Sequence, residues 1–414
     1  MKPRLVMKFG GTSVGDLDRM RAAAAKVKAE ADRGFDVAVV VSAMSGKTNE
    51  LVGWVRDAAA PPGANGHGLY DAREYDAVVA SGEQVTSGLM ALALQELGID
   101  ARSWQGWQVP VKTTDAHGAA RIVEIPTDNL AEKFAEGRHA VIAGFQGVGP
   151  DGRITTLGRG GSDTTAVAFA AALEAARCDI YTDVDGVYTT DPRIERRARR
   201  IEKISYEEML ELASLGAKVL QTRSVELAMR YAVPLRVLSS FEEGPGTLVC
   251  AEEDIVEQNV VSGIAYSRDE AKATLLKVPD RPGVAASIFG PLAEAGVNVD
   301  MIVQNIGADG MTDMTFSMTV DQIPLARQAL DNAQSDIGYQ ELLIDDEVAK
   351  VSIVGIGMRS HAGVAQKMFS ALAEDGVNIK VITTSEIKVS VLIQRRFLEL
   401  AVQTLHRAFE LETA

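Results

Sequence analysis

The sequence is poor in cysteine. Its 414 residues include only Cys178 and Cys250, which stand far apart and in no CxxC pattern. This excludes a disulfide scaffold and fits a reducing compartment. Neither cysteine has a histidine close to it in the sequence, so we interpret both as small buried side chains.

Long hydrophobic runs are also missing. The longest uninterrupted apolar run is Ala166–Leu173, which is far shorter than a membrane span. Near the N-terminus, Lys8 ends the short apolar stretch Leu5–Met7, so a signal peptide does not fit there. We therefore expect a cytoplasmic protein.

Basic residues are fewer than acidic ones. The sequence has 42 lysines and arginines and 57 aspartates and glutamates, which gives a formal net charge of −15. Nucleic acid and anionic membranes need a basic face, so we expect neither as a partner. Any anionic substrate must instead meet a local cluster of positive groups. With 46% hydrophobic and 24% charged residues, the chain is an ordinary globular one. At about 150 residues per domain, its length suggests two to four domains.

Several common catalytic patterns are absent. The five histidines have no metal-ligand spacing, and no GxSxG elbow occurs. Gly46-Lys47-Thr48 resembles the end of a Walker A loop, but Val41 stands where that loop needs a glycine. A GxGxxG fingerprint would have to end at Asp163 or at Ser360. We therefore disfavour a P-loop NTPase and a nicotinamide dehydrogenase.

The first 240 or so residues alternate between short β-rich runs and helical patterns. This alternation predicts a largely parallel sheet covered by helices on both faces. A turn at Glu242–Gly246, followed by the acidic stretch Ala251–Gln258, indicates a domain boundary. The expected strands are Leu5–Phe9, Val37–Ser42, Ala140–Phe145 and Asp179–Asp183, the expected helices are Asp16–Arg33, Tyr70–Leu97 (interrupted by Gly82) and Ser162–Ala176, and the expected loop is Pro61–Gly66.

The remaining tail contains an internal repeat. Gly283-Val284-Ala285 recurs as Gly363-Val364-Ala365, and Gly296-Val297-Asn298 recurs as Gly376-Val377-Asn378, always with the same offset of 80 residues. Each copy reads strand, helix, strand, strand, helix. We expect two copies of a small α+β unit. Two alanine-rich helices with similar glycine caps would be the plainer explanation, but a constant offset makes it improbable.

The segment Lys8–Ser13 (KFGGTS) lies between a predicted strand and a predicted helix. Gly10 and Gly11 let the backbone approach an anion closely, and Thr12 and Ser13 can cap the helix. The helix N-terminus and Lys8 add positive charge. The segment is therefore a candidate phosphate cradle, although a simple strand–turn–helix junction would have the same pattern.

Four further places carry candidate polar groups, and some of them also have a plainer explanation. Ser42, Ser45 and Thr48 follow an apolar strand, where loop capping is an equally good reading. Arg159, in the glycine-rich stretch before the helix that begins at Ser162, offers a fork for a carboxylate or phosphate. Thr182–Arg193 clusters acids with Tyr188 and Arg193, and turn chemistry explains only part of it. Glu83, read locally, would be a solvated glutamate.

Together these segments closely resemble the aspartate kinases of the amino-acid kinase superfamily. The resemblance covers essentially the whole chain and rests on KFGGTS, on SAMSGKTN at Ser42–Asn49, on Ser81–Glu83, on TLGRGGSDTT at Thr156–Thr165 and on TDVDGVYTTDPR at Thr182–Arg193. It implies an α/β fold: an amino-acid-kinase three-layer sandwich with a mainly parallel central sheet, followed by two α+β ACT (ferredoxin-like) domains. The implied domains are a catalytic domain at 1–250 and ACT domains at 260–340 and 345–414.

The resemblance also implies the reaction and its residues. An aspartate kinase transfers the ATP γ-phosphate to the β-carboxylate of L-aspartate, which gives 4-phospho-L-aspartate, the first step towards lysine, threonine and methionine. The implied catalytic residues are Lys8, Asp163 and Arg159. In this resemblance, Arg159 binds the α-carboxylate of aspartate and Glu83 binds its ammonium group. The implied substrate-binding residues are Ser42, Thr48, Glu83, Arg159, Gly160, Gly161 and Ser162. ATP binding falls to Lys8, Phe9, Gly10, Gly11, Thr182, Asp183, Tyr188, Arg193 and Lys218.

For the tail, the resemblance implies feedback inhibition by lysine, threonine or both. The matching effector positions are Asp280, Gly283, Ala285, Asn298, Asp300, Gln304, Asn378 and Ile379. It further implies Mg²⁺ with ATP as co-substrate, for which we name no protein ligand, and a homo-oligomer joined through the ACT domains, with or without a separately translated regulatory chain. Two alternatives remain. One is another acyl-phosphate-forming enzyme such as a glutamate kinase, and the other is a non-catalytic amino-acid sensor.

Overall fold

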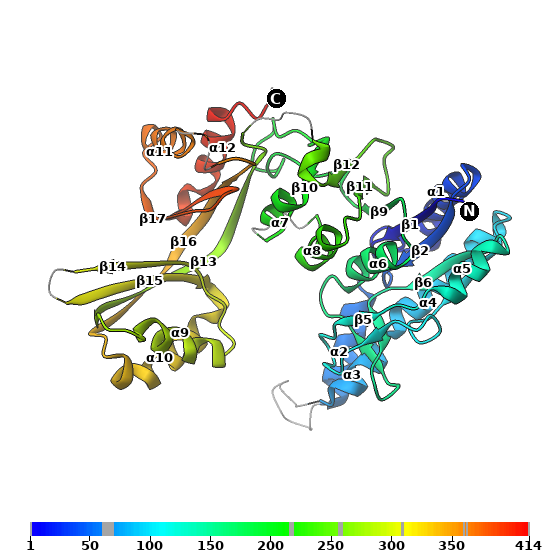
Figure 1. Cartoon of the computed structure of the whole chain (residues 1–414), viewed down its shortest axis with the longest axis horizontal. Helices are drawn as coiled ribbons and strands as arrows, with labels where there is room; N and C mark the ends of the chain where they lie inside the picture. Colours follow the sequence, from blue (N-terminus) through cyan, green and yellow to red (C-terminus); the bar gives the residue numbers. More distant parts are fainter. Residues whose placement is uncertain are drawn as a thin grey trace. The chain divides into compact units, whose positions relative to one another are not determined.

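Figure 1 shows a computed structural model of the chain, which describes residues 2–59, 70–214, 219–255, 260–307, 310–358, 361 and 363–412. The expected loop Pro61–Gly66 lies outside these residues. Backbone contacts divide the chain into two compact units. The first takes in Met1–Val187, Arg200–Ala213 and Lys218–Glu257, and the second takes in Tyr188–Arg199, Ser214–Ala217 and Gln258–Ala414.

An eight-stranded sheet forms the centre of the first unit, in the order β10-β12-β11-β9-β1-β2-β6-β3. Neighbouring strands are parallel except for β11 and β12. The expected mainly parallel sheet is therefore confirmed. Its strands are β1 (Arg4–Phe9), β2 (Asp36–Val41), β3 (Ala101–Trp104), β6 (His139–Ala143), β9 (Arg177–Thr182), β10 (Lys203–Ser205), β11 (Leu235–Ser239) and β12 (Thr247–Cys250).

Helices cover both faces of this sheet. Helices α1 (Leu17–Asp32) and α4 (Ser81–Glu96) pack against the face that presents Leu5, Met7 and Phe9, and these side chains share one buried cluster. Helix α6 (Gly161–Ala172) packs against β1, β2 and β9 from the opposite face and contacts α8 (Thr222–Arg230). The remaining helices of this unit are α2 (Lys47–Ala59), α3 (Ala72–Val79), α5 (Asp128–Ala135) and α7 (Tyr206–Ser214).

A second, smaller sheet in the first unit was not predicted. Its order is β5-β4-β7-β8, and helix α3 packs against β8. Its strands are β4 (Lys112–Thr113), β5 (Ile122–Glu124), β7 (Gln146–Val148) and β8 (Ile154–Thr156). Strands of two or three residues are too short to show an alternating pattern, so the sequence has no periodic signal for them.

Some predicted boundaries were wrong. The helical stretch predicted at Tyr70–Leu97 breaks at Ala80 rather than at Gly82. Gly82 is the second residue of α4, and a side chain does not fit there, because a Cβ would come within 2.7 Å of the Ala43 side chain. By length and composition Ala72–Glu96 could cross a membrane, but half of its most apolar window is buried within the fold. Helix α4 is a core helix, since its Met90 and Leu94 belong to the central cluster.

The second unit is built on a six-stranded antiparallel sheet, in the order β14-β15-β13-β16-β18-β17. The two long strands in the middle, one from each repeat, pair with each other. Figure 1 shows α9 and α10 side by side along one half of this sheet. The elements are β13 (Gly263–Pro279), α9 (Val284–Glu294), β14 (Asp300–Ile306), β15 (Met311–Thr319), α10 (Ile323–Ile337), β16 (Glu341–Val354), α11 (Val364–Glu374), β17 (Ile379–Thr384), β18 (Lys388–Gln394) and α12 (Leu398–Ala408).

The internal repeat is therefore a structural repeat, as predicted. Gly283 and Gly363 precede the first helix of each copy with φ of +93° and +102°, and Gly296 and Gly376 follow it with φ of +75° and +71°. This left-handed backbone favours glycine, which explains why glycine recurs at the constant offset.

The segment Tyr188–Arg199 belongs to the second unit although it precedes the tail by many residues. The Thr189 hydroxyl lies 3.0 Å from Nε2 of the buried His406. The Gln403 amide donates to the Ile194 carbonyl at 2.8 Å. The Tyr266 hydroxyl donates to Asp191 at 2.8 Å. This packing was not predicted, because nothing in the local pattern of the segment indicates its distant partners.

Both cysteines are buried and free, as expected. Burial raises the pKa of the Cys178 thiol well above its ordinary value and also raises that of Cys250. Both side chains therefore stay protonated near neutral pH and pack as small apolar groups.

Candidate functional site

The alternation of β1 directs Lys8 towards helix α6. Leu5, Met7 and Phe9 point to the opposite face, so Lys8 faces the first turn of α6 near the carboxyl end of its strand. Its Nζ lies 2.5 Å from Oδ1 of Asp163, and both side chains are only about one-tenth exposed. A lysine charge is thus held, together with its counter-ion, at the edge where parallel sheets bind ligands.

The glycine loop after β1 lies tightly against its neighbours. The Gly10 amide donates to the Tyr181 carbonyl at 3.2 Å, and a Cβ on Gly10 would lie 3.4 Å from Lys8 Nζ. A Cβ on Gly11 would come within 2.8 Å of the Ala43 carbonyl oxygen. The absence of a side chain at Gly11 therefore lets this loop lie directly against the loop that follows β2.

Glu83 lies buried in the first turn of α4, with only 3% of its surface exposed. Its Oε1 accepts a hydrogen bond from the Ala43 amide at 3.0 Å, whereas Oε2 has no partner among the residues that the structure describes. Burial raises the pKa of Glu83 to about 7, and the Ala43 hydrogen bond opposes this only partly. A buried carboxylate with one unsatisfied oxygen is a candidate acceptor for a cationic group.

The loop between β8 and α6 presents Arg159. Gly160 has φ of +72°, and a Cβ there would collide with the Gln221 side chain at 2.1 Å. Arg159 is exposed, and its guanidinium has no hydrogen bond or ion pair within the described ranges. A Cβ on Gly144, which follows β6, would lie 2.9 Å from the buried Ser162 and from the Val41 carbonyl. This contact places Ser162 beside the end of β2, close to Ser42.

The end of β9 carries Thr182 and Asp183. The Thr182 carbonyl accepts from the Ser240 amide at 2.9 Å, and the Thr182 hydroxyl donates to the exposed Asp183 at 3.2 Å. Ser240 in turn donates its hydroxyl to Ser13 at 2.6 Å. These contacts connect the glycine loop, the end of β9 and the end of β11 along one edge of the sheet.

The structure therefore brings most of the predicted site residues of the first unit to the carboxyl edge of the sheet. Thr48 is half-buried and lies at the start of α2, the helix that follows the Ser42–Ser45 loop in the sequence. Tyr188 and Arg193 belong to the second unit, where the exposed Arg193 pairs with Asp191 at 3.0 Å. Lys218 lies outside the described residues.

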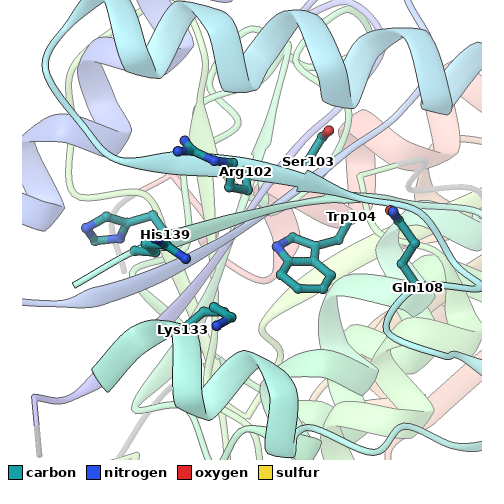
Figure 2. Close-up of a pocket in the computed structure, with 7 residues that line it drawn as sticks. Arg102, Ser103, Trp104, Gln108, Lys133 and His139 are labelled. Atoms are coloured by element: carbon teal, nitrogen blue, oxygen red, sulfur yellow. The ribbon is translucent and has the colours of Figure 1, made fainter. Parts of the chain in front are cut away.

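A pocket of about 280 Å³ lies away from this edge, between β3, β6 and α5. Figure 2 shows Trp104 of β3 facing Lys133 of α5, with His139 beside them. His139 accepts a hydrogen bond from the Val37 amide at the start of β2, whereas Trp104 is the last residue of β3, so the pocket runs along β3, the last strand in the order of the large sheet. Its cations are already paired, for example Lys133 with Glu136 at 2.8 Å. We do not assign the chemistry to this pocket.

Among the described residues, no three histidine, cysteine or acidic side chains gather closely enough to hold a metal ion. The edge instead offers Lys8 and Arg159 to anions, and Glu83 to a cation. This combination suits a zwitterionic substrate and a phosphate donor.

Comparisons with known proteins agree with this chemistry. The amino acid kinase family matches residues 3–239, and ACT domain families match residues 273–333 and 351–409. An aspartokinase of Pseudomonas aeruginosa is 55% identical over 410 residues, which cover 99% of this chain and 98% of the relative. The chain belongs to the aspartate kinases. It is thus a phosphotransferase that carries two ACT domains.

Solved aspartate kinases share the fold. Escherichia coli aspartokinase III in complex with aspartate and ADP is 29% identical, with a TM-score of 0.81 over 98% of this chain and 99% of that one. The same enzyme in complex with lysine and aspartate gives a TM-score of 0.77, with the same identity and coverage. The predicted α/β fold with two ACT domains is therefore confirmed.

The candidate effector residues all lie in the second unit. Asp300 opens β14, and its Oδ2 lies 2.8 Å from Nζ of the buried Lys350, which also contacts Glu270 at 3.0 Å. The lysine lowers the pKa of Asp300 despite partial burial. Asp280, Gly283, Ala285, Asn298, Gln304 and Asn378 are exposed, and Ile379 is half-buried at the start of β17.

Sequence reasoning missed several residues of the first unit that contact the site loops. Ser240 donates a hydrogen bond to Ser13 of the glycine loop. Asp76 and Arg223 bind Thr156 and Leu157, which directly precede the loop that carries Arg159. Ser239-Ser240 after an apolar strand was a usable signal, because such strand ends line ligand sites. Asp76 and Arg223 stand in helices without a recognisable motif.

Gly11→Ala tests the close approach of the glycine loop. The added Cβ would meet the Ala43 carbonyl at 2.8 Å, so one of the two loops must shift. We expect kcat/KM for ATP to fall by about 10-fold or more, since a 1 Å displacement in an active site can cost about 100-fold. Gly53→Ala, in open space on α2, is the matched control and should leave kinetics unchanged. The measurement is a steady-state assay at varied ATP concentration. An unchanged kcat/KM for ATP in Gly11→Ala would contradict the assignment of the glycine loop to phosphate binding.

Proposed function

We propose that this aspartate kinase transfers the γ-phosphate of ATP to the β-carboxylate of L-aspartate and forms 4-phospho-L-aspartate. The observation that carries the proposal is the carboxyl edge of the sheet. It combines a lysine at the glycine loop with the buried, half-satisfied Glu83 and the unpaired Arg159. The aspartate and ADP bound to the E. coli relative support the same pair of substrates.

Arg159 and Glu83 recognise the two charged groups that every α-amino acid carries. The Arg159 guanidinium pairs with the α-carboxylate, for which its planar fork is suited. Glu83 accepts the α-ammonium group through its unsatisfied Oε2. Ser42, Thr48 and Ser162 donate hydroxyls around the substrate, and Gly160 and Gly161 leave it room. The β-carboxylate then points towards Lys8.

Lys8, with the backbone of Phe9, Gly10 and Gly11, holds the phosphoryl group that is transferred. Asp163 orients the Lys8 ammonium group through their ion pair. Thr182, Asp183, Tyr188, Arg193 and Lys218 are the remaining residues that we assign to ATP. Mg²⁺ would be held by the ATP phosphates and water, as is common for this ion, and would neutralise phosphate charge.

The reaction needs little acid–base chemistry. The β-carboxylate has an ordinary pKa of about 3.9, so it is ionised at neutral pH and attacks the γ-phosphorus in line. A carboxylate oxygen bonds to the γ-phosphorus while the bond to the β–γ bridging oxygen breaks, and ADP leaves. The protein contributes position and charge stabilisation. Lys8 and the amides of the glycine loop act on the charge that develops in the transition state. The acyl phosphate product is labile in water, which favours the partly buried setting of Lys8 and Asp163.

Substrate comparison tests the proposal. Purified protein with ATP and Mg²⁺ should release ADP with aspartate far faster than with glutamate or N-acetylglutamate. A preference for either competitor would favour another acyl-phosphate-forming kinase. ATP binding without turnover of any of them would favour an amino-acid sensor.

We further propose that lysine, threonine or both inhibit the enzyme through the ACT domains, at the effector residues named above. The lysine in one E. coli aspartokinase III structure supports an amino-acid effector. We also propose domains at 1–250, 260–340 and 345–414, a homo-oligomer joined through the ACT domains, with or without a separate regulatory chain, and a cytoplasmic location.

Asp300→Asn tests the effector assignment. The change removes a carboxylate that we expect to bind an effector ammonium group, while Lys350 keeps Glu270 as a partner. We expect the effector concentration for half-inhibition to rise by about 10-fold or more, with basal kcat unchanged. Glu399→Gln, which removes an exposed ion pair with Arg268 in the same unit, is the control. Unchanged inhibition by lysine and threonine, alone and combined, would contradict the assignment.

A further inference from the structure

Asp76 is a fully buried carboxylate that takes no part in the chemistry proposed above. It lies in α3 with no exposed surface and accepts hydrogen bonds on both oxygens. Oδ1 accepts from the Thr156 hydroxyl at 2.5 Å and from the Gly118 amide at 3.0 Å. Oδ2 lies 2.7 Å from Nδ1 of His117. One helix residue thus holds the end of β8 and a turn from a distant part of the chain.

Arg223 holds the same region from another helix. Its guanidinium donates to the Leu157 carbonyl at 2.9 Å and to the Ala120 carbonyl at 3.0 Å. Ala120 in turn donates its amide to the Thr156 carbonyl at 2.9 Å. Asp76 of α3 therefore binds the Thr156 hydroxyl. Arg223 of α8 binds the Leu157 carbonyl directly and the Thr156 carbonyl through Ala120.

The residues on both sides of Arg159 pack against these two anchored parts of the chain. A Cβ on Gly158 would lie 3.2 Å from the Gly118 carbonyl, so the turn held by Asp76 packs against the residue before Arg159. On the other side, Gly160 lies against Gln221, which precedes α8. Arg159 itself keeps its hydrogen-bonding capacity, since it has no partner within the described ranges.

We propose that Asp76 and Arg223 are positioning residues that hold the Leu157–Gly161 loop so that Arg159 meets the α-carboxylate of the substrate. The inference rests on the proposed function, because it takes from it the role of Arg159. Neither residue touches substrate in this arrangement. Both act through the loop and therefore affect aspartate rather than ATP.

The physical reason lies in the loop itself. Gly158 and Gly160 have φ of +76° and +72°, and Gly161 follows directly, so the stretch around Arg159 has little conformational restriction of its own. A flexible arginine would lose conformational entropy each time it bound a carboxylate. Anchoring the backbone on both sides lowers this cost before the substrate arrives.

Thr156→Val tests the Asp76 contact, because valine keeps the shape of threonine and removes only the hydroxyl. We expect KM for aspartate to rise by about 10-fold, kcat to change less than about twofold, and KM for ATP to stay unchanged. Thr156→Ser restores the hydroxyl and should restore KM. Thr155→Val is the matched control. It removes another buried hydroxyl from the same strand, one that lies 2.6 Å from Thr113 rather than near Asp76.

Arg223→Lys tests the second anchor and keeps the experiment decisive if Thr156→Val fails to fold. Lysine retains the charge, but its compact ammonium group is not suited to bridge two carbonyls as the guanidinium does. We expect the same selective rise in KM for aspartate, with Arg121→Lys, at an exposed position nearby, as the control.

The outcomes separate positioning from general stability. Equal changes in Thr155→Val and Thr156→Val, or an unaltered KM for aspartate in both Thr156→Val and Arg223→Lys, would overturn the inference. Wild-type turnover of aspartate tests the proposed function separately. If the wild-type enzyme prefers another acceptor, the proposed function fails whatever the variants show.

Discussion

Replacing Lys8 with alanine should lower kcat by about 1,000-fold or more while the protein stays folded. Cationic groups aimed at a transferring phosphoryl group contribute about 10³ to 10⁵ in kcat, and single oxyanion donors about 10² to 10³. Lys8 is the cation at the glycine loop, and only about one-tenth of its side chain is exposed, so water screens its charge poorly. Binding of aspartate, held by other residues, should change far less than kcat.

The measurement is ADP release at saturating aspartate and ATP, together with thermal unfolding. Lys8→Ala leaves Asp163 without its partner in a mostly buried place, so some loss of stability is expected. Lys28→Ala is the control, because Lys28 pairs with the exposed Asp32 on the same helix, α1. A folded Lys8→Ala enzyme with near-normal kcat would remove the proposed role of the lysine.

Glu83→Gln should weaken aspartate binding and stabilise the substrate-free protein. Glutamine keeps an acceptor for the Ala43 amide but loses the charge that pairs with the ammonium group. Hydrogen bonds to charged groups contribute about 1.5–3 kcal/mol, so KM for aspartate should rise by about 10- to 100-fold. In the wild type, KM should also rise as pH falls below about 7, because Glu83 then becomes protonated. The variant should show no such pH dependence.

Although Glu83→Gln weakens aspartate binding, it should raise the free energy of unfolding of the substrate-free protein. The folded pKa of about 7 exceeds the ordinary value of 4.5, so the folded protein holds a proton that the unfolded chain releases. Wild-type stability therefore falls as pH rises from 4.5 to 7, and the full cost, on the order of 3 kcal/mol, remains above pH 7. Glutamine avoids this cost. The free energy of unfolding of Glu83→Gln, measured without substrate at about pH 8 and about pH 5, should exceed that of the wild type by much more at the higher pH. A lower free energy of unfolding at both pH values would contradict the assignment.

The fold was predictable from the sequence where its signals were local. Apolar strands such as Val37–Val41 and the glycine loop after Lys8 each lie within a few consecutive residues. The tail repeat was visible because glycine is required at the same left-handed positions in both copies. The strands of the small sheet, by contrast, are too short for any periodic signal.

The candidate site was less accessible to local reasoning. Glu83 looks like a solvated helix residue, and its burial arises only because Gly82 lets α4 approach Ala43, which is distant in sequence. The resemblance to a family, rather than the pattern, pointed to it. Asp76 has neither a motif nor a family role in our prediction, because its partners come from separate loops that meet only in the folded chain.

The packing of Tyr188–Arg199 with the tail means that the boundary between the two units is not a single point along the polypeptide. A regulatory fragment that begins after residue 260 would lack Thr189, the hydroxyl partner of His406. Burial lowers the pKa of that histidine, so inside the fold it is held neutral and depends on hydrogen bonding rather than on charge. Domain exchange between related enzymes would therefore work best when this early segment and the tail come from the same parent.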